Sequence, residues 1–389
     1  MLPTDSPTGR RRPLRPIFGF AVALAVAGCS LFSSPPTPSP LPSATRTPRP
    51  TPVESPTSGL GTFTIAASMN TSRVGATATL LSDGEVLIAG GTSGGQKLAS
   101  AELFVPRSGT FISTGAMTVP RAGHNATLLP NGNVLLTGGS GDNSAEVYNS
   151  SNGTFTRTGA LVDAFEQRTA ISLGDGRVLV AGGSLGGQFA SNTEIYFSEN
   201  GKFSRGRYLI EARANARAVP LPDGRILIIG GDQGVSGRYA NILNSVEFFN
   251  PSTGRFAAAP SMRDARTHFA AVLLQDGRVL VIGGLNLTVP YGILKSAEIY
   301  DPGTARWSVA GSMSEGRSDF TAAVLDDGRV LVAGGGDRSA EMFDPKTGTF
   351  ESIALMNMPR ERQTATLLKD TRVLLTGGSE DPAAEFFNP

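Results

Sequence analysis

The sequence predicts an all-β protein in which seven similar four-stranded sheets close into a ring, a β-propeller. The main observation is a phrase that occurs seven times and reads Asp-Gly-Arg-Val-Leu-Val-Ile-Gly-Gly at residues 276–284. The glycine doublets that end successive copies lie 43 to 53 residues apart. A period of that size indicates a repeat architecture. The doublets begin at Gly90, Gly138, Gly182, Gly230, Gly283, Gly334 and Gly377.

Each repeat is expected to supply four strands. The first precedes an Asp-Gly or Asn-Gly dipeptide such as Asp83-Gly84, which accepts the positive φ values of a two-residue type I′ hairpin. The second ends at the doublet, where missing side chains allow another backbone to approach. The third carries one glutamate, which we expect to accept backbone N–H groups of a loop. These glutamates are Glu102, Glu146, Glu194, Glu247, Glu298, Glu341 and Glu385.

The two ends of the folded part together make up one repeat. The fourth strand of six repeats opens with an aromatic residue, and Met or Leu follows six positions later. The seventh repeat stops at Phe387-Asn388-Pro389, before any such strand, while Phe63 and Met69 near the start have the same spacing. The N-terminal segment is therefore predicted to be the outer strand of the last blade, which closes the ring and hides sheet edges.

The glycine doublet, the glutamate before an aromatic pair and the turn at residues 344–348, Asp-Pro-Lys-Thr-Gly, together resemble kelch repeats. The resemblance covers residues 58–389, and the wording of the phrase is closest to the bacterial galactose-oxidase-like branch of that superfamily. It implies a seven-bladed propeller. Kelch propellers mostly bind partners and a few are enzymes, so the resemblance specifies the fold and leaves the activity open.

Charge and cysteine content exclude some classes of function. The formal net charge of the 389 residues is +1, which gives no surface for nucleic acid. The single cysteine, Cys29, rules out an intramolecular disulfide. We expect a monomer.

The first 28 residues are predicted to be a signal peptide. Arginines 10, 11, 12 and 15 precede an apolar run at residues 17–27 that is too short to span a bilayer. The run ends in Val-Ala-Gly-Cys, which resembles a bacterial lipobox and implies that Cys29 is acylated. This places the protein in a bacterial cell envelope, outside the cytoplasm and anchored to a membrane by lipid. The alternative is an ordinary signal peptide with an incidental cysteine.

Residues 29–57 are predicted to be a linker. Nine prolines stand among serines and threonines here, a composition that favours extended polyproline II and cannot form a core. We interpret the segment as a stalk between the lipidated cysteine and the propeller of residues 58–389.

A repeated arginine is the first candidate for ligand binding. It lies eleven residues before the turn glycine, and the third copy has Phe165 instead. Guanidinium groups suit carboxylates and phosphates, and the position is expected at one mouth of the ring. The resemblance adds that arginines of this region grip acidic peptides in some kelch domains. The alternative is that each arginine pairs with a neighbouring blade and locks the ring. The arginines are Arg73, Arg121, Arg213, Arg266, Arg317 and Arg360.

The loops between the second and third strands are the second candidate. Six to sixteen residues separate the last glycine of each doublet from the glutamate, so these loops break the symmetry of the repeat. They are expected on the same face as the arginines, and variable loops on a rigid scaffold are a usual place for function. The two longest contain Arg238, Tyr239 and Tyr291. Drift in exposed loops is the alternative.

Three functions remain open. A binding or scaffold module would meet an acidic protein or glycan through this face. A carbohydrate epimerase or lyase would need an acid–base pair, for which Asp264, Glu315 and Asp319 are the nearest candidates. An architectural envelope protein would need no ligand. No metal or cofactor is expected, because His124 and His268 stand in blades that are not neighbours and no third ligand accompanies them.

Overall fold

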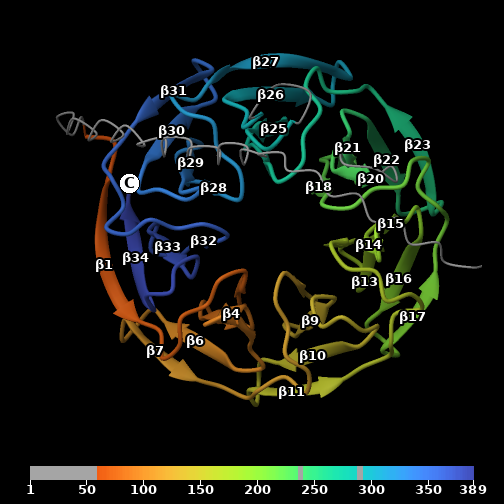
Figure 1. Cartoon of the computed structure of the whole chain (residues 1–389), viewed down its shortest axis with the longest axis horizontal. Helices are drawn as coiled ribbons and strands as arrows, with labels where there is room; N and C mark the ends of the chain where they lie inside the picture. The colour runs from red at the N-terminus through yellow and green to blue at the C-terminus, as the bar shows by residue number, and fades with distance from the viewer. Residues whose placement is uncertain (1–58, 235–239, 287–291) are drawn as a thin grey trace, which may run out of the picture. The chain divides into compact units, whose positions relative to one another are not determined.

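The computed structural model describes residues 59–234, 240–286 and 292–389. In these residues seven four-stranded antiparallel sheets form a ring of blades and no helix occurs (Figure 1). Accordingly, the described residues contain no helix that could cross a membrane. The all-β, seven-bladed prediction is confirmed. The predicted signal peptide (1–28) and linker (29–57), with Cys29, lie outside the described residues.

The blades are numbered along the chain, and their strands run from the centre of the ring outward. Blade 1 comprises β2 (Thr77–Leu80), β3 (Val86–Ala89), β6 (Ala101–Val105) and β7 (Thr110–Ser113), and blade 2 comprises β8 (Asn125–Leu128), β9 (Val134–Thr137), β10 (Ala145–Asn149) and β11 (Thr154–Arg157). Blade 3 comprises β12 (Thr169–Ser172), β13 (Arg177–Ala181), β16 (Thr193–Phe197) and β17 (Lys202–Arg205), and blade 4 comprises β18 (Arg217–Pro220), β19 (Ile226–Ile229), β22 (Val246–Asn250) and β23 (Arg255–Ala259). Blade 5 comprises β24 (Ala270–Leu273), β25 (Val279–Ile282), β26 (Ser296–Asp301) and β27 (Arg306–Ser312), and blade 6 comprises β28 (Thr321–Val324), β29 (Val330–Ala333), β30 (Ala340–Asp344) and β31 (Thr349–Ser352). Blade 7 comprises β32 (Thr364–Leu367), β33 (Val373–Thr376), β34 (Ala383–Asn388) and β1 (Thr62–Ser68).

Three small hairpins stand between the second and third strands of blades 1, 3 and 4. They are β4 (Thr92–Ser93) with β5 (Gln96–Lys97), β14 (Ser184–Leu185) with β15 (Gln188–Phe189), and β20 (Asp232–Gly234) with β21 (Ala240–Ile242).

Ring closure follows the prediction from the chain ends. β1 pairs antiparallel with β34, and Phe63 lies opposite Phe387 (Figure 1). The ring centroids of these two residues are 5.1 Å apart, against 4.8 Å for the corresponding pair Phe343–Phe350 of blade 6. The outer strand from the N-terminal side thus makes the same aromatic contact as the outer strands that follow in sequence.

The hydrophobic core is divided into seven clusters, one at each interface between neighbouring blades. The second strand of every blade contributes to two of them, because alternate side chains of a strand point to opposite faces. In β3, Val86 and Ile88 pack toward blade 7 while Leu87 and Ala89 pack toward blade 2. This explains why the second strands are continuous apolar runs, and why each blade needs both neighbours.

The inner hairpins differ from the predicted two-residue type I′ turn. Leu81 N–H donates to the carbonyl of Glu85, which leaves a three-residue loop in which only Gly84 has a positive φ, of 97°. This is the pattern of a type I turn followed by a left-handed residue. Asp83 accepts the N–H of Glu85, so the aspartate stabilises the turn without a left-handed backbone. In blade 7 the left-handed position is Thr371, with φ 73°.

We predict that β1 is required for the stability of the propeller. A chain that begins at residue 70 lacks the outer strand of blade 7 and exposes Phe387 and its neighbours, so its melting temperature should fall by at least about 5 °C. A chain that begins at residue 59 keeps β1 and is the control, which should melt like the full chain. Equal melting temperatures for the two truncations, measured by calorimetry, would contradict the closure.

Candidate functional site

The repeated arginines are buried inside the blades and cannot reach a ligand. Arg266 is fully buried, and its Nη2 lies 3.0 Å from Oε1 of Glu298 in the same blade. Its Nη1 donates to the carbonyls of Gly283 and Ser296, at 2.9 and 2.8 Å. Burial lowers the pKa of Arg266, and the hydrogen bond and charge of Glu298 oppose that shift.

The same ion pair recurs at all six arginines, none of which is more than 2% exposed. Their assignment as ligand-binding residues is therefore wrong, because each guanidinium is enclosed by its own blade. The structural alternative holds in modified form, since the acid comes from the same blade and not from the neighbouring one. The pairs are Arg73–Glu102, Arg121–Glu146, Arg213–Glu247, Arg266–Glu298, Arg317–Glu341 and Arg360–Glu385.

The glutamates also accept backbone N–H groups, as predicted. Glu298 accepts from Arg263 at 2.7 Å and from Asp264 at 3.1 Å, both in the connection that arrives from blade 4. Each carboxylate thus satisfies a buried cation and the backbone of an incoming loop at once. The corresponding acceptors are Glu102, Glu146, Glu194, Glu247, Glu341 and Glu385.

Blade 3 keeps the interaction although it lacks the arginine. Phe165 occupies the usual position, and Arg168, three residues later, lies 2.6 Å from Oε1 of Glu194. The sequence comparison by fixed spacing missed Arg168. A buried glutamate without a cation would have been the signal to search for one nearby.

The arginine backbone joins neighbouring blades. The carbonyl of Arg317 accepts the N–H of Gly284, the last glycine of the doublet in blade 5, at 2.8 Å. A Cβ on Gly283 would lie 2.7 Å from that carbonyl, so the doublet permits the approach. The corresponding bond from Gly378 to Arg73 closes the ring between blades 7 and 1 at 2.9 Å.

Two residues after the position of the repeated arginine, which is Phe165 in blade 3, the backbone is left-handed in all seven repeats. We call these seven residues the rim. They are Gly75, Gly123, Gln167, Asn215, His268, Asp319 and Arg362, with φ between 52° and 67°. A left-handed backbone is uncommon for residues other than glycine and costs free energy, and such positions gather at functional sites. Blades 3 to 7 therefore retain side chains where blades 1 and 2 have glycine.

Backbone hydrogen bonds join consecutive rim residues at the start of the innermost strands. Asp319 N–H donates to the carbonyl of His268 at 3.2 Å, and Arg362 N–H donates to that of Asp319 at 2.7 Å. The innermost strands β2, β8, β12, β18, β24, β28 and β32 are neighbours in a closed circle. The rim therefore encircles the axis of the ring at one face.

Three rim side chains form a polar cluster in blades 5 to 7. Nδ1 of His268 lies 2.9 Å from Oδ1 of Asp319, and Nε of Arg362 lies 3.6 Å from the same oxygen. All three are accessible, with side-chain exposures of 27%, 20% and 56% for His268, Asp319 and Arg362. Burial acts to raise the pKa of Asp319, but the hydrogen bond from His268 and the charges of His268, Arg362 and Arg217 lower it overall.

Arg217 adds a second cation to the cluster. It opens the innermost strand β18, exposes its side chain, and donates from Nε to the carbonyl of Phe269 in blade 5 at 2.9 Å. The surrounding protein lowers its pKa by desolvation, and the charge of Asp319 opposes this shift. His268 and Arg362 thus contact the Asp319 carboxylate, and Arg217 acts on it through its charge. This grouping was not predicted from the sequence, because His268 and Asp319 were considered separately and the repeated arginines, not Arg217 and Arg362, were singled out as binding residues.

The variable loops lie beside the rim, as predicted. In blades 1, 3, 4 and 5 an isolated β-bridge joins the segment before the innermost strand to the start of the loop, as in Val74 with Thr92 and Thr267 with Leu285. Asn215 of the rim donates to Asp232 in the loop of blade 4 at 2.9 Å. The candidate residues Arg238, Tyr239 and Tyr291 lie outside the described residues.

The other histidine has a structural role. His124 is buried, its Nε2 lies 3.0 Å from Oγ1 of Thr77, and burial together with the charge of Arg121 lowers its pKa to about 3. Within the described ranges no group of three or more His, Cys, Asp or Glu residues is placed to hold a metal ion.

We predict that the Arg–Glu pairs stabilise the fold. Arg266→Ala and Glu298→Ala should each lower the free energy of unfolding by about 3–5 kcal/mol, because the remaining charge stays buried without its partner. The double replacement Arg266→Met with Glu298→Leu removes both charges and should cost less than either single change. Denaturant unfolding measures all three variants. Single variants as stable as the parent protein would contradict the role.

Known proteins share the repeat and the fold. The kelch motif matches residues 213–263 and 266–314, which lie in blades 4 and 5 and the connections before them. An F-box/kelch-repeat protein of Arabidopsis thaliana is 40% identical over 78 residues, 20% of either chain. Kelch-like protein 34 of Homo sapiens is 32% identical over 94 residues, 24% of this chain and 14% of the human protein. The chain thus matches a fifth or less of the length of these curated relatives.

A solved structure of similar fold is a fungal alcohol oxidase of the AA5 family in complex with copper. It superposes with a TM-score of 0.68 at 17% identity, over 85% of this chain and 76% of the oxidase. At that identity the likeness concerns the fold. The described residues thus form a seven-bladed β-propeller that contains kelch motifs in blades 4 and 5.

Proposed function

We propose that the protein is a membrane-anchored, extracytoplasmic binding module whose rim face takes an acidic group of a protein or glycan ligand. The observation that carries the proposal is the accessible cluster of Arg217, Arg362 and His268 around the single carboxylate of Asp319. Kelch propellers mostly bind partners, and the kelch motifs of blades 4 and 5 support the same role here.

The charge of the cluster selects the ligand. Arg217 and Arg362 bring two positive charges against the one negative charge of Asp319, so a carboxylate or phosphate entering the rim would be attracted. The left-handed backbone sets the direction of the Asp319 and Arg362 side chains, and the hydrogen bond to Phe269 holds Arg217, which limits the entropy lost on binding. The buried arginines support this site by holding the blades rather than by touching the ligand.

Anchoring through Cys29 belongs to the same proposal. The basic segment, the apolar run and the sole cysteine at the end of the lipobox-like sequence support it. A multiply acylated cysteine binds a membrane stably, and residues 30–57 would set the propeller off its surface. Intact-mass analysis of the mature protein should show acyl chains on an N-terminal Cys29; an unmodified N-terminus downstream of it would refute the anchor.

Charge reversal at the rim tests the binding role. Binding of poly-L-glutamate and of polygalacturonate, measured by titration calorimetry at low salt, should weaken at least tenfold in Arg362→Glu and in Arg217→Glu. The matched control is Arg107→Glu, an exposed arginine of the β6–β7 turn, which should bind like the parent. Melting temperatures should remain unchanged, because Arg362 is more than half exposed. Unaltered binding in both Arg362→Glu and Arg217→Glu would overturn the proposal.

A second candidate function rests on the His268–Asp319 pair. The carboxylate accepts a hydrogen bond from Nδ1, which leaves Nε2 of a neutral ring free to take a proton, the arrangement of a general base. A carbohydrate lyase or epimerase acting next to a carboxylate would use this pair. Turnover of polygalacturonate that disappears in His268→Asn would establish the enzyme, whereas binding without any product would exclude it for this polymer.

A further inference from the structure

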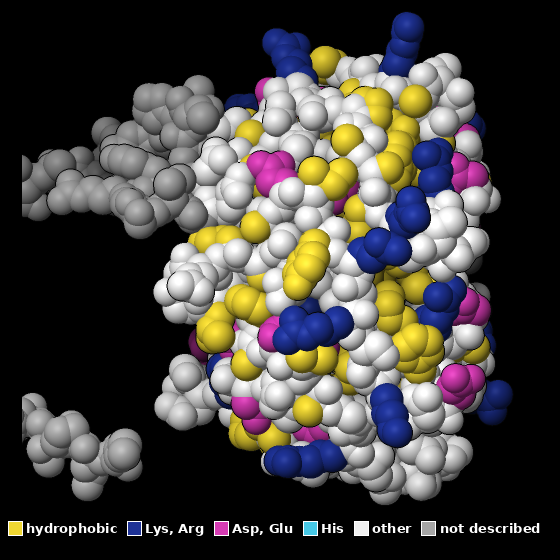
Figure 2. All heavy atoms as spheres, turned by 90° about the vertical axis from the view of Figure 1, so that its right-hand side faces the viewer, with side chains coloured by type: hydrophobic (Ala, Val, Ile, Leu, Met, Phe, Trp, Pro, Cys, Tyr) yellow, Lys and Arg dark blue, Asp and Glu magenta, His cyan; other side chains and the backbone are white. Residues whose placement is uncertain are grey.

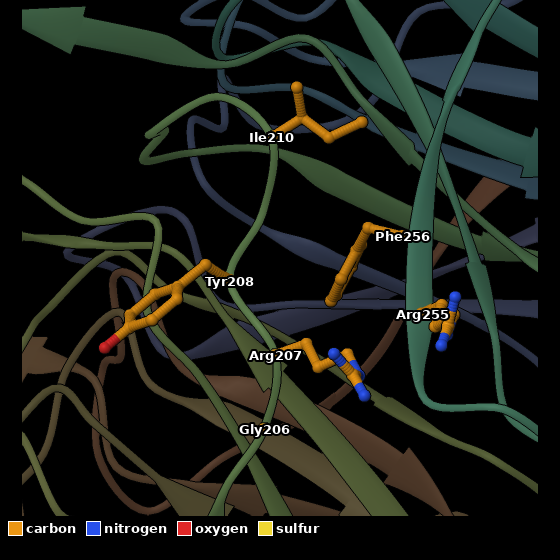
Figure 3. A pocket seen from close by; sticks show the side chains of 6 residues that line it. All are labelled: Gly206, Arg207, Tyr208, Ile210, Arg255 and Phe256. Atoms are coloured by element: carbon orange, nitrogen blue, oxygen red, sulfur yellow. The ribbon is translucent and has the colours of Figure 1, made fainter.

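The outer wall of the ring has a hollow between blades 3 and 4, and none of its lining residues belongs to the rim cluster. Its volume is about 550 Å³, and it lies between the segment that follows β17 and the outer strand β23 (Figure 3). Figure 3 shows the ring of Phe256 between Ile210 and the guanidinium groups of Arg207 and Arg255. The hollow therefore combines an apolar floor with two cations.

The side chains around the hollow are unusually exposed for their type. Tyr208 and Ile210 are 62% and 61% exposed, the two highest values among the large hydrophobic residues of the described chain. Arg207 and Arg255 are exposed as well, and neither guanidinium has an ion-pair partner in the described ranges. Figure 2 faces this side of the ring, where hydrophobic and basic side chains lie next to each other. Exposed apolar side chains that gather beside basic ones make this part of the surface a candidate for an interaction site.

The strand that borders the hollow has a free edge. β23 pairs with β22 on one side only, since it is the last strand of its sheet. After Phe256 it continues with three alanines and, like β1 and β7 after their phenylalanine, carries no charge there, whereas the outer strands β11, β17 and β31 carry Arg157, Arg205 and Glu351 near their ends. Charged residues protect an edge from pairing, and small uncharged ones leave its N–H and C=O groups open.

We propose that this hollow binds an extended acidic peptide, which adds to β23 as a further strand. Main-chain hydrogen bonds to an open edge supply affinity in this mode, and side-chain pockets supply specificity. An apolar side chain of the peptide rests on Phe256 and Ile210, and its carboxylates meet Arg207 and Arg255.

The chemistry of the hollow favours a peptide over other occupants. A sugar chain has no row of alternating N–H and C=O groups to pair with β23. A second copy of this chain would have to pair through an outer strand, and among the seven outer strands only β31 contains an acidic residue. Neither would satisfy both the edge and the two arginines.

The test uses the full chain and a fluorescein-labelled octapeptide of alternating glutamate and leucine, followed by fluorescence anisotropy. The dissociation constant should rise at least tenfold in the double variant Arg207→Glu with Arg255→Glu, and also in Ile210→Lys. The matched control is Arg306→Glu, an exposed arginine that begins β27 and precedes Trp307 as Arg255 precedes Phe256. This control should bind like the parent.

Further probes decide between peptide and other occupants. The same octapeptide with glutamine for glutamate, or with alternate backbone amides methylated, should lose most of its binding. Equal binding of the methylated peptide would overturn strand addition. Competition by polygalacturonate as effective as that by the unlabelled peptide would mark a glycan site, and a concentration-dependent rise in molecular mass lost in the double variant would mark self-association. Either result would refute the proposal.

Discussion

The buried ion pair between an arginine and the glutamate of the third strand is the interaction on which the rest of the propeller depends. A lone buried charge is strongly destabilising, so the pair exists only because every partner is supplied locally. In blade 5 the guanidinium of Arg266 meets the Glu298 carboxylate and two carbonyls, while that carboxylate also takes two N–H groups of the incoming loop. The carbonyl of the next arginine then accepts from the glycine doublet, which links one blade to the following one. A single repeated unit thus neutralises the buried charge, fixes the incoming loop and joins each blade to the next.

Much of the fold could be predicted from the sequence, because the motif that forms one blade occurs seven times. The spacing of doublets, glutamates and aromatic residues predicts the blades, and the displaced pair Phe63 and Met69 predicts the closing strand. The direction of the arginine side chains could not be read in this way. Spacing places Arg266 near one face of the ring, but only the fold shows that its side chain turns inward to Glu298. Arg168 escaped for a related reason, since a compensating cation need not occupy the same repeat position.

The surface proposed to bind a ligand lies two residues after the arginine position that builds the blades. The arginine position is uniform because it builds the blade, whereas the rim position only has to adopt a left-handed backbone and can carry different side chains. Glycine meets that requirement at Gly75 and Gly123 at little cost. His268, Asp319 and Arg362 adopt the same backbone at a cost in free energy, and residues with such a cost are typical of functional sites. The hollow beside β23 also contains residues that differ from the repeat, namely the alanines of β23 and, among the described residues, Arg207 and Arg255 without an ion-pair partner.

The repeated arginines are enclosed while Arg217 and Arg362 are open, and chemical labelling tests this difference directly. Phenylglyoxal modifies accessible guanidinium groups, and mass spectrometry locates each modified residue. In the folded protein Arg362 and Arg217 should be modified readily, whereas Arg73, Arg121, Arg213, Arg266, Arg317 and Arg360 should react only after unfolding. Modification of the six repeated arginines at the rate of Arg362 in the native state would contradict the account.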